Sequence, residues 1–382
     1  MNAFDRHFSN VREVALALRP SYPVYCLRPD EIRRSARSFL DAFPGRVLYA
    51  VKCNPHPLVL DALYAEGIRH FDTASLSEVA LIRESFADAT AYFMHPVKAR
   101  AAIEMADDVY HVKHWVIDHV NELKKLVEVM PSRHGQAVLV RIATQAFGAA
   151  FELSNKFGAT ADEAVALLKT VADEGFQAGL AFHVGSQCRD PEAFSHAIGT
   201  VDKVLKASDV SIQYLDLGGG FPATYFDDAP PPLDQFIATI RDALESLDLR
   251  GDCVFMCEPG RALVASGCSL LTQVQLRKED EIYLNDGVYH SLSEAGAHIR
   301  HPVRLLRLDG EPSSNLRAFK AFGPTCDCLD VIPSPVELPD DVREGDWIEF
   351  GQVGAYSNAM RTTFNGFYPE TFVTVDEAPL HS

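Results

Sequence analysis

The sequence predicts an α/β fold, an N-terminal (β/α)8 TIM-type barrel, followed by an all-β C-terminal domain built as a β-barrel or sandwich. Three observations lead to this prediction. Short apolar runs alternate with helical or polar segments from about residue 30 to 265. Eight such runs in roughly 235 residues match the size of a TIM barrel. Beyond residue 265 helical periodicity fades, and short strands separated by Gly, Pro and Asp take over.

The barrel strands are expected where β-branched, aromatic and other apolar residues run together and end at a turn residue. Their ranges are 47–51, 69–72, 91–94, 114–117, 137–142, 179–183, 212–217 and 253–257. A helix is expected to begin at Pro29, because two acidic residues follow in its first turn. An open, doubly wound sheet is the alternative arrangement of the same elements.

The barrel is expected to span residues 27–266, and the β domain residues 267–382 together with residues 1–26. Strands of the β domain are predicted at 270–276, 282–284, 302–306 and 347–350. The strand-like segment 22–26 is a candidate to join them, although it lies at the other end of the sequence.

Composition excludes several classes of protein. A formal net charge of −18 argues against nucleic acid or an anionic membrane as partner. No apolar run approaches the ~20 residues that a membrane span needs, and the polar segment 1–20 is not a signal peptide. Eight scattered cysteines lack zinc-site spacing, so we expect no metal site and a cytoplasmic protein with mostly buried thiols.

Lys52 ends the apolar run 47–51 and stands just before an Asn-Pro turn. A buried ammonium is costly unless it is paired or neutral. We therefore expect desolvation to lower the pKa of Lys52 and to make it an amine nucleophile suited to Schiff-base chemistry. The alternative is a lysine whose ammonium reaches solvent from the strand end.

Polar residues follow the C-terminal ends of the predicted strands, where the active sites of TIM barrels lie. They are Lys52, Asp72, Arg141, His183, Gly218-Gly219-Gly220 and Glu258. Each has an ordinary alternative: a core histidine for His183, a helix N-cap for Asp72, a tight turn for the glycines. Their gathering at one edge of the barrel favours a common site.

The glycine run gives an anion access to successive backbone N–H groups, because no side chains intervene. Glu258-Pro259-Gly260-Arg261 adds an acid and a fixed cation one strand later, and arginine beside such a turn suits a phosphate. A phosphate, an aldehyde for Lys52 and a ring nitrogen for Glu258 together describe pyridoxal 5′-phosphate (PLP). Its protonated ring accepts electrons.

With these residues, the sequence resembles the fold-type III PLP-dependent decarboxylases of the ornithine/diaminopimelate group, and within it the ornithine decarboxylase branch. The resemblance covers nearly the whole chain. It rests on the segments Ala50-Val51-Lys52-Cys53-Asn54-Pro55, Phe71-Asp72-Thr73-Ala74-Ser75, His183-Val184-Gly185-Ser186, residues 215–222, Glu258-Pro259-Gly260-Arg261, residues 323–327, residues 354–356 and residues 363–367. It implies decarboxylation of a basic L-amino acid, ornithine or lysine, to a diamine such as putrescine, as in polyamine biosynthesis.

The resemblance also implies roles at the cofactor. Lys52 would hold PLP as a Schiff base, Glu258 would pair with the pyridine nitrogen, and His183 would stack on the ring. The phosphate would be bound by Gly219, Gly220, Arg261 and Tyr356, with Ser186 close by. The lysine and the cofactor's surroundings would be ordered by Asp72, Glu78 and Arg141.

Further roles implied by the resemblance require a homodimer with shared active sites. Cys326 and Asp327 would reach the site of the other subunit, Cys326 to protonate the substrate carbon after CO2 leaves and Asp327 to face the distal amine. Cys326 also stands in a Gly-Pro turn beside an acid, which suits a proton donor, although a small buried hydrophobe is the ordinary alternative. Lys156 and Asp330 match a pair that bridges the subunits.

One segment departs from the ornithine decarboxylases. Ala297-His298 stands where those relatives have Tyr-Asp, and Glu294 and Asp327 are the acids that remain nearby. We therefore expect Asp327, Glu294 and His298 to bind the substrate's side chain. With Arg300 also present, a second hypothesis is a modified substrate with a neutral or carboxylate-bearing side chain, as in siderophore-type pathways.

A third hypothesis is a non-catalytic regulator of the antizyme-inhibitor type, which lacks the cofactor. The presence of Lys52, Glu258, Arg261 and Cys326 together argues against it.

Overall fold

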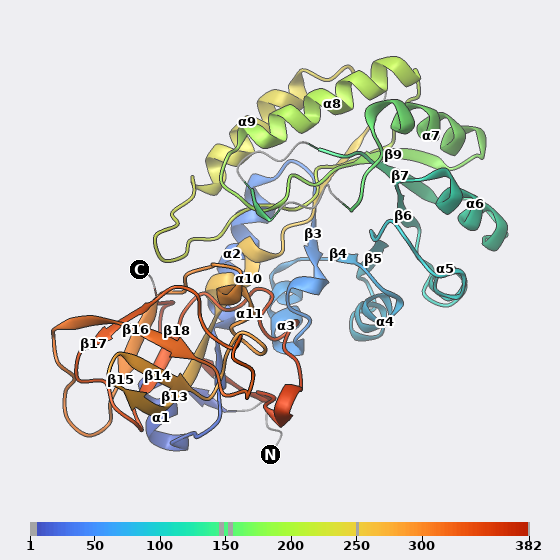
Figure 1. The fold of residues 1–382 in the computed structure, drawn as a ribbon. Helices are drawn as coiled ribbons and strands as arrows, with labels where there is room; N and C mark the ends of the chain where they lie inside the picture. Colours follow the sequence, from blue (N-terminus) through green and yellow to red (C-terminus); the bar gives the residue numbers. More distant parts are fainter. Residues whose placement is uncertain (1–5, 145–148, 152–155, 250–251, 381–382) are drawn as a thin grey trace.

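The computed structural model describes residues 6–144, 149–151, 156–249 and 252–380. Eight parallel strands close into a barrel, and a separate sheet domain lies beside it (Figure 1). The neighbour order around the barrel is β11-β12-β3-β4-β5-β6-β7-β9. The predicted fold class is confirmed, and closure of the sheet excludes the doubly wound alternative. The exact domain boundaries stay a prediction.

Each barrel strand overlaps one of the eight predicted runs. The strands are β3 (Arg46–Ala50), β4 (His70–Thr73), β5 (Thr90–Phe93), β6 (His114–Ile117), β7 (Ala137–Arg141), β9 (Gln177–Ala181), β11 (Tyr214–Asp216) and β12 (Val254–Cys257). Strands of a covered barrel are buried on both faces, so their sequences read as continuous apolar runs.

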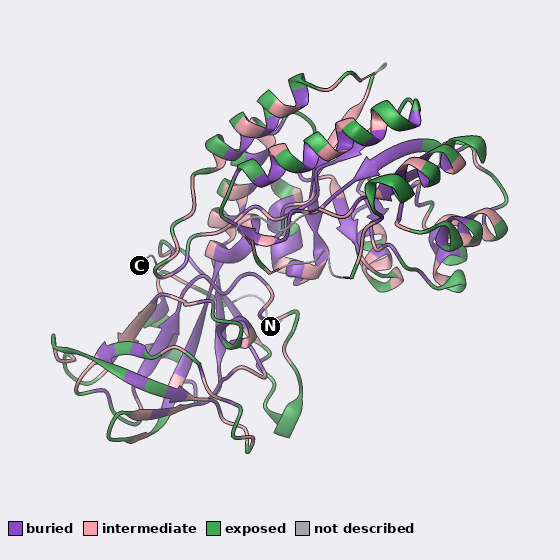
Figure 2. Ribbon diagram, turned by 45° about the horizontal axis from the view of Figure 1, so that its top comes forward, coloured by how far each residue is buried: buried purple, intermediate pink, exposed green. Residues whose placement is uncertain are grey.

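Helices cover the outside of the barrel and turn their buried faces inward (Figure 2). They are α2 (Pro29–Ala42), α3 (Pro57–Glu66), α4 (Leu76–Ser85), α5 (Arg100–Asp108), α6 (Val120–Val129), α7 (Ala161–Asp173), α8 (Glu192–Ser208), α9 (Leu233–Glu245) and the short α10 (Arg261–Val264). Helix α2 begins at Pro29 as predicted. Its buried residues Ile32, Ala36 and Phe39 have the spacing of one helical face.

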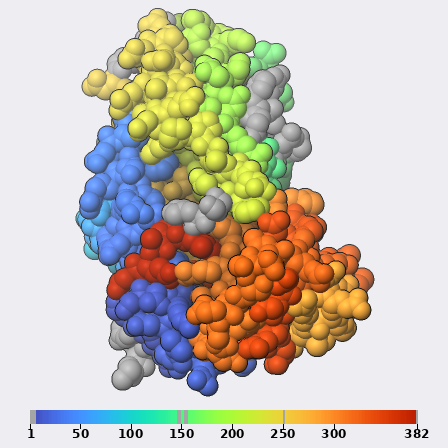
Figure 3. Space-filling model, turned by 90° about the vertical axis from the view of Figure 1, so that its left-hand side faces the viewer, coloured from blue at the N-terminus to red at the C-terminus, as the bar shows by residue number. Residues whose placement is uncertain are grey.

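The second domain is a sheet that includes both ends of the described chain. Its strands are β1 (His7–Phe8), β2 (Val24–Leu27), β13 (Cys268–Lys278), β14 (Glu281–Leu284), β15 (Val303–Leu306), β16 (Leu316–Phe322), β17 (Val336–Pro339), β18 (Trp347–Phe350) and β19 (Thr371–Val375). Strand β2 lies between β13 and β19, so the expectation that segment 22–26 joins this domain is confirmed. Figure 3 shows the N-terminal segment (blue) packed beside the C-terminal segment (red) on one face of the molecule.

Several short elements of the structure were not predicted. They are β1, β16, β17, β19, helices α1 (Val11–Leu18) and α11 (Ser293–Gly296), and the antiparallel pair β8 (Ala149–Phe151) and β10 (Ser186–Cys188). The pair matters for function, because β10 begins at Ser186, beside the predicted phosphate site.

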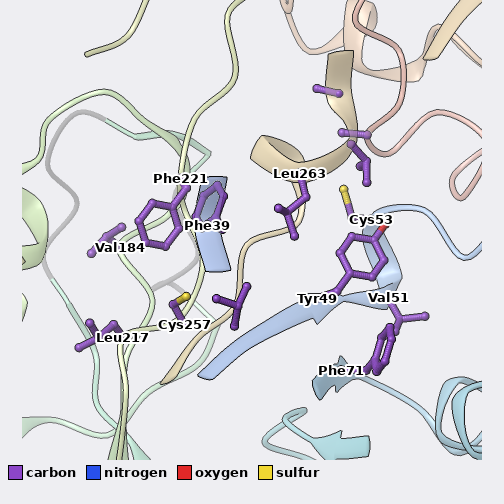
Figure 4. Packing of buried hydrophobic residues seen from close by; sticks show 14 of the residues in the cluster. Phe39, Tyr49, Val51, Cys53, Phe71, Val184, Leu217, Phe221, Cys257 and Leu263 are labelled. Atoms are coloured by element: carbon purple, nitrogen blue, oxygen red, sulfur yellow. The ribbon is translucent and has the colours of Figure 1, made fainter. Parts of the chain in front are cut away.

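The core has an inner and an outer part. Outside the strands, Phe39, Tyr49, Phe71, Phe221 and Leu263 belong to a large buried cluster (Figure 4). Inside the barrel, the side chains of a smaller cluster fill the lumen: Leu48, Tyr92, Met94, Val116, Ala137, Leu139, Ala181 and Met256. Side chains alternate along a strand. The residues two positions after these inner ones therefore face the barrel's C-terminal mouth, where the predicted site lies.

Two observations bear on the surroundings of the protein. Within the described ranges, no helix has the length and apolar character needed to cross a membrane. No disulfide is found in the described part of the chain, and Cys326 and Cys328 are the exposed cysteines.

Candidate cofactor site

A small cavity opens at the C-terminal mouth of the barrel. Its walls are Ala50, Lys52, His183, Ser186, Gly219, Gly220, Phe221, Glu258, Gly260, Arg261 and Tyr356. Eight of the ten predicted cofactor-binding residues line it. The other two, Asp72 and Arg141, end strands β4 and β7 at the same mouth. Residues from seven separate segments thus converge. Six of these segments stand at the ends of barrel strands, which the parallel arrangement brings together, and Tyr356 comes from the β domain.

Lys52 lies one residue after β3, in a single 3-10 turn (Val51–Cys53), with a side chain that is 40 % exposed. Its ammonium donates a hydrogen bond to the buried carboxylate of Asp72. Burial lowers the pKa of Lys52, but the negative charges of Asp72 and Glu258 outweigh burial and hold that pKa above its ordinary value. The prediction of a lowered pKa was wrong. Without cofactor the amine is protonated, and a base must remove its proton before it can attack an aldehyde.

Asp72 is the nearest candidate for that base. The alternative role of helix N-cap belongs to Ser75 instead, whose hydroxyl accepts the N–H of Glu78 at 3.2 Å. Glu78 in turn accepts the N–H of Ala74 at 2.7 Å. Burial raises the pKa of Glu78. These contacts fix the turn after β4 and leave the Asp72 carboxylate facing Lys52.

His183 contacts the glycine turn. Its Nδ1 accepts the N–H of Gly185 at 3.0 Å, which places a ring proton on Nε2. Burial and the charges of Arg141 and Lys52 hold the pKa of His183 well below its ordinary value, so the ring is neutral. A neutral, fixed imidazole can stack on a flat cofactor without adding a charge.

The glycine turn fits an anion because side chains are excluded from it. Gly218 and Gly220 have φ of 66° and 112°. A Cβ on Gly219 would lie 2.7 Å from the carbonyl oxygen of Glu258, and one on Gly220 would lie 2.5 Å from the carbonyl oxygen of Gly185. The backbone therefore approaches the cavity as no other residue type permits.

Arg261 supplies the cation beside this turn and is 3 % exposed. Its guanidinium donates to Ser186 Oγ at 3.3 Å and to Tyr225 Oη at 2.7 Å, and the ring of Tyr356 lies 5.1 Å from its Cζ. The Nε–H of Arg261 is buried and has no acceptor among the described atoms. A buried unpaired donor is costly, and a phosphate oxygen would satisfy it.

Glu294 has a different contact from the predicted one. Both of its carboxylate oxygens lie 2.6 Å from the terminal nitrogens of Arg261, and the side chain is buried. The prediction that Glu294 binds the substrate's side chain is corrected, because its carboxylate is already occupied by this ion pair.

The remaining predicted residues lie outside the cavity of the same chain. Cys326 and Asp327 lie on a loop of the β domain, where Cys326 is exposed and Asp327 is half-buried. The Asp327 carboxylate accepts the N–H of Leu329 at 2.9 Å and the hydroxyl of Tyr289 at 2.7 Å, and these bonds hold its pKa below the ordinary value. His298 is exposed with φ of 68°, and Arg300 pairs with Asp227.

The predicted bridging pair is also separate within one chain. Asp330 is buried and accepts the N–H groups of Val288 and Thr325, each at 3.0 Å. The ammonium of Lys156 instead lies 5.0 Å from the ring of Phe157, and the guanidinium of Arg141 lies 5.6 Å from the same ring.

Comparison with known families identifies the family to which this chain belongs. Residues 29–265 match the family model that describes the pyridoxal binding domain of the pyridoxal-dependent decarboxylases. The chain belongs to the pyridoxal-dependent decarboxylase family.

Relatives of this decarboxylase span more than one activity. It is 31 % identical over 342 residues to the lysine/ornithine decarboxylase of Selenomonas ruminantium, covering 87 % of this chain and 84 % of that protein. It is 34 % identical over 361 residues to antizyme inhibitor 2 of Xenopus laevis, covering 88 % and 77 %. The structure of the Paramecium bursaria Chlorella virus arginine decarboxylase bound to agmatine superposes with a TM-score of 0.84 at 28 % identity, covering 96 % and 98 %.

The cavity fits the family's cofactor, PLP. The unpaired Arg261 Nε and the side-chain-free glycine turn suit its phosphate. Lys52 is the amine of the cavity lining, Glu258 is its acid, and the neutral His183 lines the same cavity. Burial and the charges of Asp216 and Asp72 raise the pKa of Glu258 well above its ordinary value, so this carboxyl readily holds a proton that it can share with a ring nitrogen.

Two residues near the cofactor site, Tyr225 and Asp216, were not identified from the sequence. Tyr225 belongs to no recognised sequence motif, and only the fold brings its hydroxyl within hydrogen-bonding distance of Arg261. Asp216 precedes the glycine turn within a recognised segment but received no role. The alternation of side chains along a strand could have identified it, because Asp216 faces the inside of the barrel together with Tyr214.

Proposed function

We propose that this PLP-dependent decarboxylase acts on a basic L-amino acid, ornithine or lysine, and releases CO2 and a diamine. The observation that carries the proposal is the single cavity that joins Lys52, Glu258 and His183 to an anion-binding turn with Arg261. The activities of the related lysine/ornithine and arginine decarboxylases support a basic side chain.

Each wall of the cavity has a task in this reaction. The cofactor, when bound, supplies a protonated ring that accepts the electrons of the bond to the leaving carboxylate. Asp72 takes the proton from the Lys52 ammonium, which frees the amine for the cofactor's aldehyde. Glu258 holds the proton at the ring nitrogen. The glycine N–H groups and Arg261 anchor the phosphate, and neutral His183 fixes the plane of the ring.

A homodimer completes the site in this proposal. Cys326 is exposed, Asp327 is half-buried, and both lie outside the cavity of their own chain, so a second copy would bring them to it. The Cys326 thiol would give its proton to the substrate's α-carbon after CO2 leaves. The Asp327 carboxylate, ionised because its pKa is low, would accept the distal ammonium. The eight free thiols support action in a reducing compartment such as the cytoplasm.

A carboxylate-bearing substrate is the second candidate. It is favoured by His298, which stands exposed at the position where an acid was expected, while Glu294 is occupied by Arg261. Asp327 would oppose such a substrate, and this opposition favours the basic amino acid.

A regulator without catalysis is a third candidate, favoured by the 34 % identity to antizyme inhibitor 2. The complete cofactor cavity opposes it, because a protein that binds no PLP has no need of Lys52, Arg261 and the glycine turn together.

A product screen decides among the three. Purified protein saturated with PLP is incubated with ornithine, lysine, arginine, diaminopimelate and amino acids with acylated or carboxylate-bearing side chains, and amines are identified by mass spectrometry. We expect putrescine or cadaverine, no product from Lys52→Ala, and a yellow wild-type protein. A product from a carboxylate-bearing substrate alone supports the second candidate, and a colourless inactive protein supports the third.

A further inference from the structure

Three acids share the mouth of the barrel with two cations. Strand alternation places Asp72, Asp216 and Glu258 above the inner core residues, since Glu258 follows Met256 by two positions. Lys52 and Arg141 come from other strand ends of the same mouth. The neutral His183 and the buried thiol of Cys257 are the other titratable groups nearby. Lys52 is paired with Asp72, which leaves two carboxyl groups close together.

Asp216 and Glu258 end neighbouring strands that are locked in register. The N–H of Leu217 donates to the carbonyl of Met256 at 2.9 Å, and the N–H of Glu258 donates to the carbonyl of Gly218 at 2.8 Å. This ladder holds the two residues side by side on neighbouring strands. Asp216 is 1 % exposed, whereas Glu258 reaches the cavity.

The two oxygens of Asp216 differ in their surroundings. Oδ1 accepts the N–H of Gly218 at 2.9 Å, the contact that begins the glycine turn. Oδ2 is buried and has no N–H or hydroxyl donor among the described residues, and the only side-chain hydrogen bond that Asp216 shares is with the neighbouring carboxyl of Glu258. An ionised carboxylate oxygen without a donor, inside a protein and beside a second acid, carries a large desolvation penalty. A proton on Oδ2 removes that penalty and turns the atom into a donor toward Glu258.

We propose that Asp216 is a positioning residue that stays protonated on Oδ2 and donates to Glu258. Resting on the proposed function, this assigns Asp216 the task of keeping Glu258 ionised and oriented when it meets the protonated ring nitrogen of PLP. One proton then stays on Asp216 and another on the ring, with the Glu258 carboxylate between them. In cofactor-free protein the two carboxyl groups share the single proton.

Burial and the charge of Asp72 raise the pKa of both acids, and the charge of Asp216 raises that of Glu258 further, whereas the hydrogen bond with Glu258 lowers the pKa of Asp216. The raised pKa values agree with one proton retained by the pair. A carboxyl group with a raised pKa in the folded state binds more protons there than in the unfolded chain. Its contribution to stability is therefore lost as pH rises above the unfolded value of about 4. This signature needs no cofactor and can be measured on the apoprotein.

The test compares Asp216→Asn with Asp216→Ala. Asparagine has the shape of the protonated acid and keeps a donor toward Glu258, but it cannot titrate; alanine removes both properties. The first readout is the free energy of unfolding of cofactor-free protein between pH 4 and 7 by denaturant titration. We expect the pH slope of Asp216→Asn to differ from wild type by about one proton.

The second readout is the affinity for PLP at pH 7, measured by fluorescence quenching. We expect Asp216→Asn to retain the wild-type affinity within about threefold and Asp216→Ala to lose about tenfold or more, as for one lost buried hydrogen bond at 1.4 kcal/mol per tenfold. Equal losses in both variants would overturn the proposal, because they would mean that Asp216 acts as a charged carboxylate. An unchanged pH slope in Asp216→Asn would overturn it as well. If wild type binds no PLP, the proposed function fails, while the slope still decides on the shared proton.

Discussion

Arg261 and Glu294 form a two-point ion pair in the interior, with both carboxylate oxygens 2.6 Å from guanidinium nitrogens and both side chains nearly inaccessible to water. The pair joins the barrel to the β domain, since Arg261 begins α10 and Glu294 lies in α11. It also engages both terminal nitrogens of the guanidinium, and the buried Nε has no partner among the described residues.

Removing Glu294 should therefore be costly. Glu294→Ala leaves a buried guanidinium without its counter-charge, and such a loss is worth roughly 3–5 kcal/mol. Asp227→Ala, which breaks the exposed pair with Arg300, is the control and should cost under about 1 kcal/mol. Denaturant unfolding of both variants measures the difference. Similar small losses in both would mean that the interior pair contributes nothing beyond a surface pair.

The cofactor should be attached at Lys52. Borohydride treatment of PLP-saturated protein should leave a pyridoxyl group on the Lys52 peptide, identified by mass spectrometry. Lys98 is the internal control, because burial lowers its pKa to about 8 and makes it the other reactive amine expected from electrostatics alone. Its ammonium is enclosed by Glu122 and backbone carbonyls, and Lys98 is not among the residues that line the cofactor cavity. A label at Lys98 instead of Lys52 would contradict the assignment.

Two inactive variants should complement if the site is shared. Random mixing of Lys52→Ala and Cys326→Ala subunits gives about half heterodimers, each with one intact site of two. About a quarter of wild-type activity should return once subunits exchange. Mixing Lys52→Ala with Glu258→Ala is the control, because both changes lie in one cavity and no intact site can form. Exchange without recovery in the first mixture would place Cys326 in the site of its own chain.

The distal pocket should depend on Asp327. Asp327→Ala removes the carboxylate proposed to accept the substrate's ammonium, so kcat/KM for ornithine or lysine should fall by about 10² or more. His298→Asp places an acid at the position where the ornithine decarboxylases have one, and it should improve the use of ornithine. If His298→Asp is harmful while a carboxylate-bearing amino acid is turned over, the second candidate substrate is correct.

Acid should destabilise the protein through His114. This ring is buried in the barrel against Tyr92, with centroids 4.3 Å apart, and burial lowers its pKa from 6.5 to about 3. The folded state thus resists protonation that the unfolded chain accepts, so stability is full above pH 6.5 and falls as the pH drops toward 3. His114→Phe keeps the stacking and removes this effect. Relative to wild type it should gain about 1.4 kcal/mol per pH unit below 6.5, while exposed His134→Phe should not.

The sequence predicted the barrel well because its strands are buried on both faces. The run 47–51 is apolar throughout, and the run 137–142 is apolar except for Arg141, so their position did not depend on distant contacts. Three-residue strands such as β8 and β10 are too short for any period, and only their pairing defines them. The gathering of most site residues followed from the same rule, since they stand at the ends of barrel strands, whereas Tyr356 comes from a loop of the β domain.

The errors concerned contacts between distant residues. The direction of the Lys52 pKa depends on Asp72, 20 positions along the chain, which barrel closure brings to the ammonium. Glu294 was assigned to the substrate because its partner Arg261 is 33 positions away, in the other domain. Desolvation can be anticipated from an apolar run, but the counter-charge that reverses its effect requires the fold.

The place of β2 has a consequence for biosynthesis. This strand, Val24–Leu27, takes its hydrogen-bonded neighbours from β13 and β19, and β19 ends at Val375. A ribosome makes β2 before any barrel strand and must complete almost the whole chain before β2 is enclosed. The barrel strands, in contrast, emerge in nearly consecutive order and can pair as they appear. We expect a nascent chain stalled after residue 300 to expose the β2 segment to chaperones and proteases while its barrel is already compact.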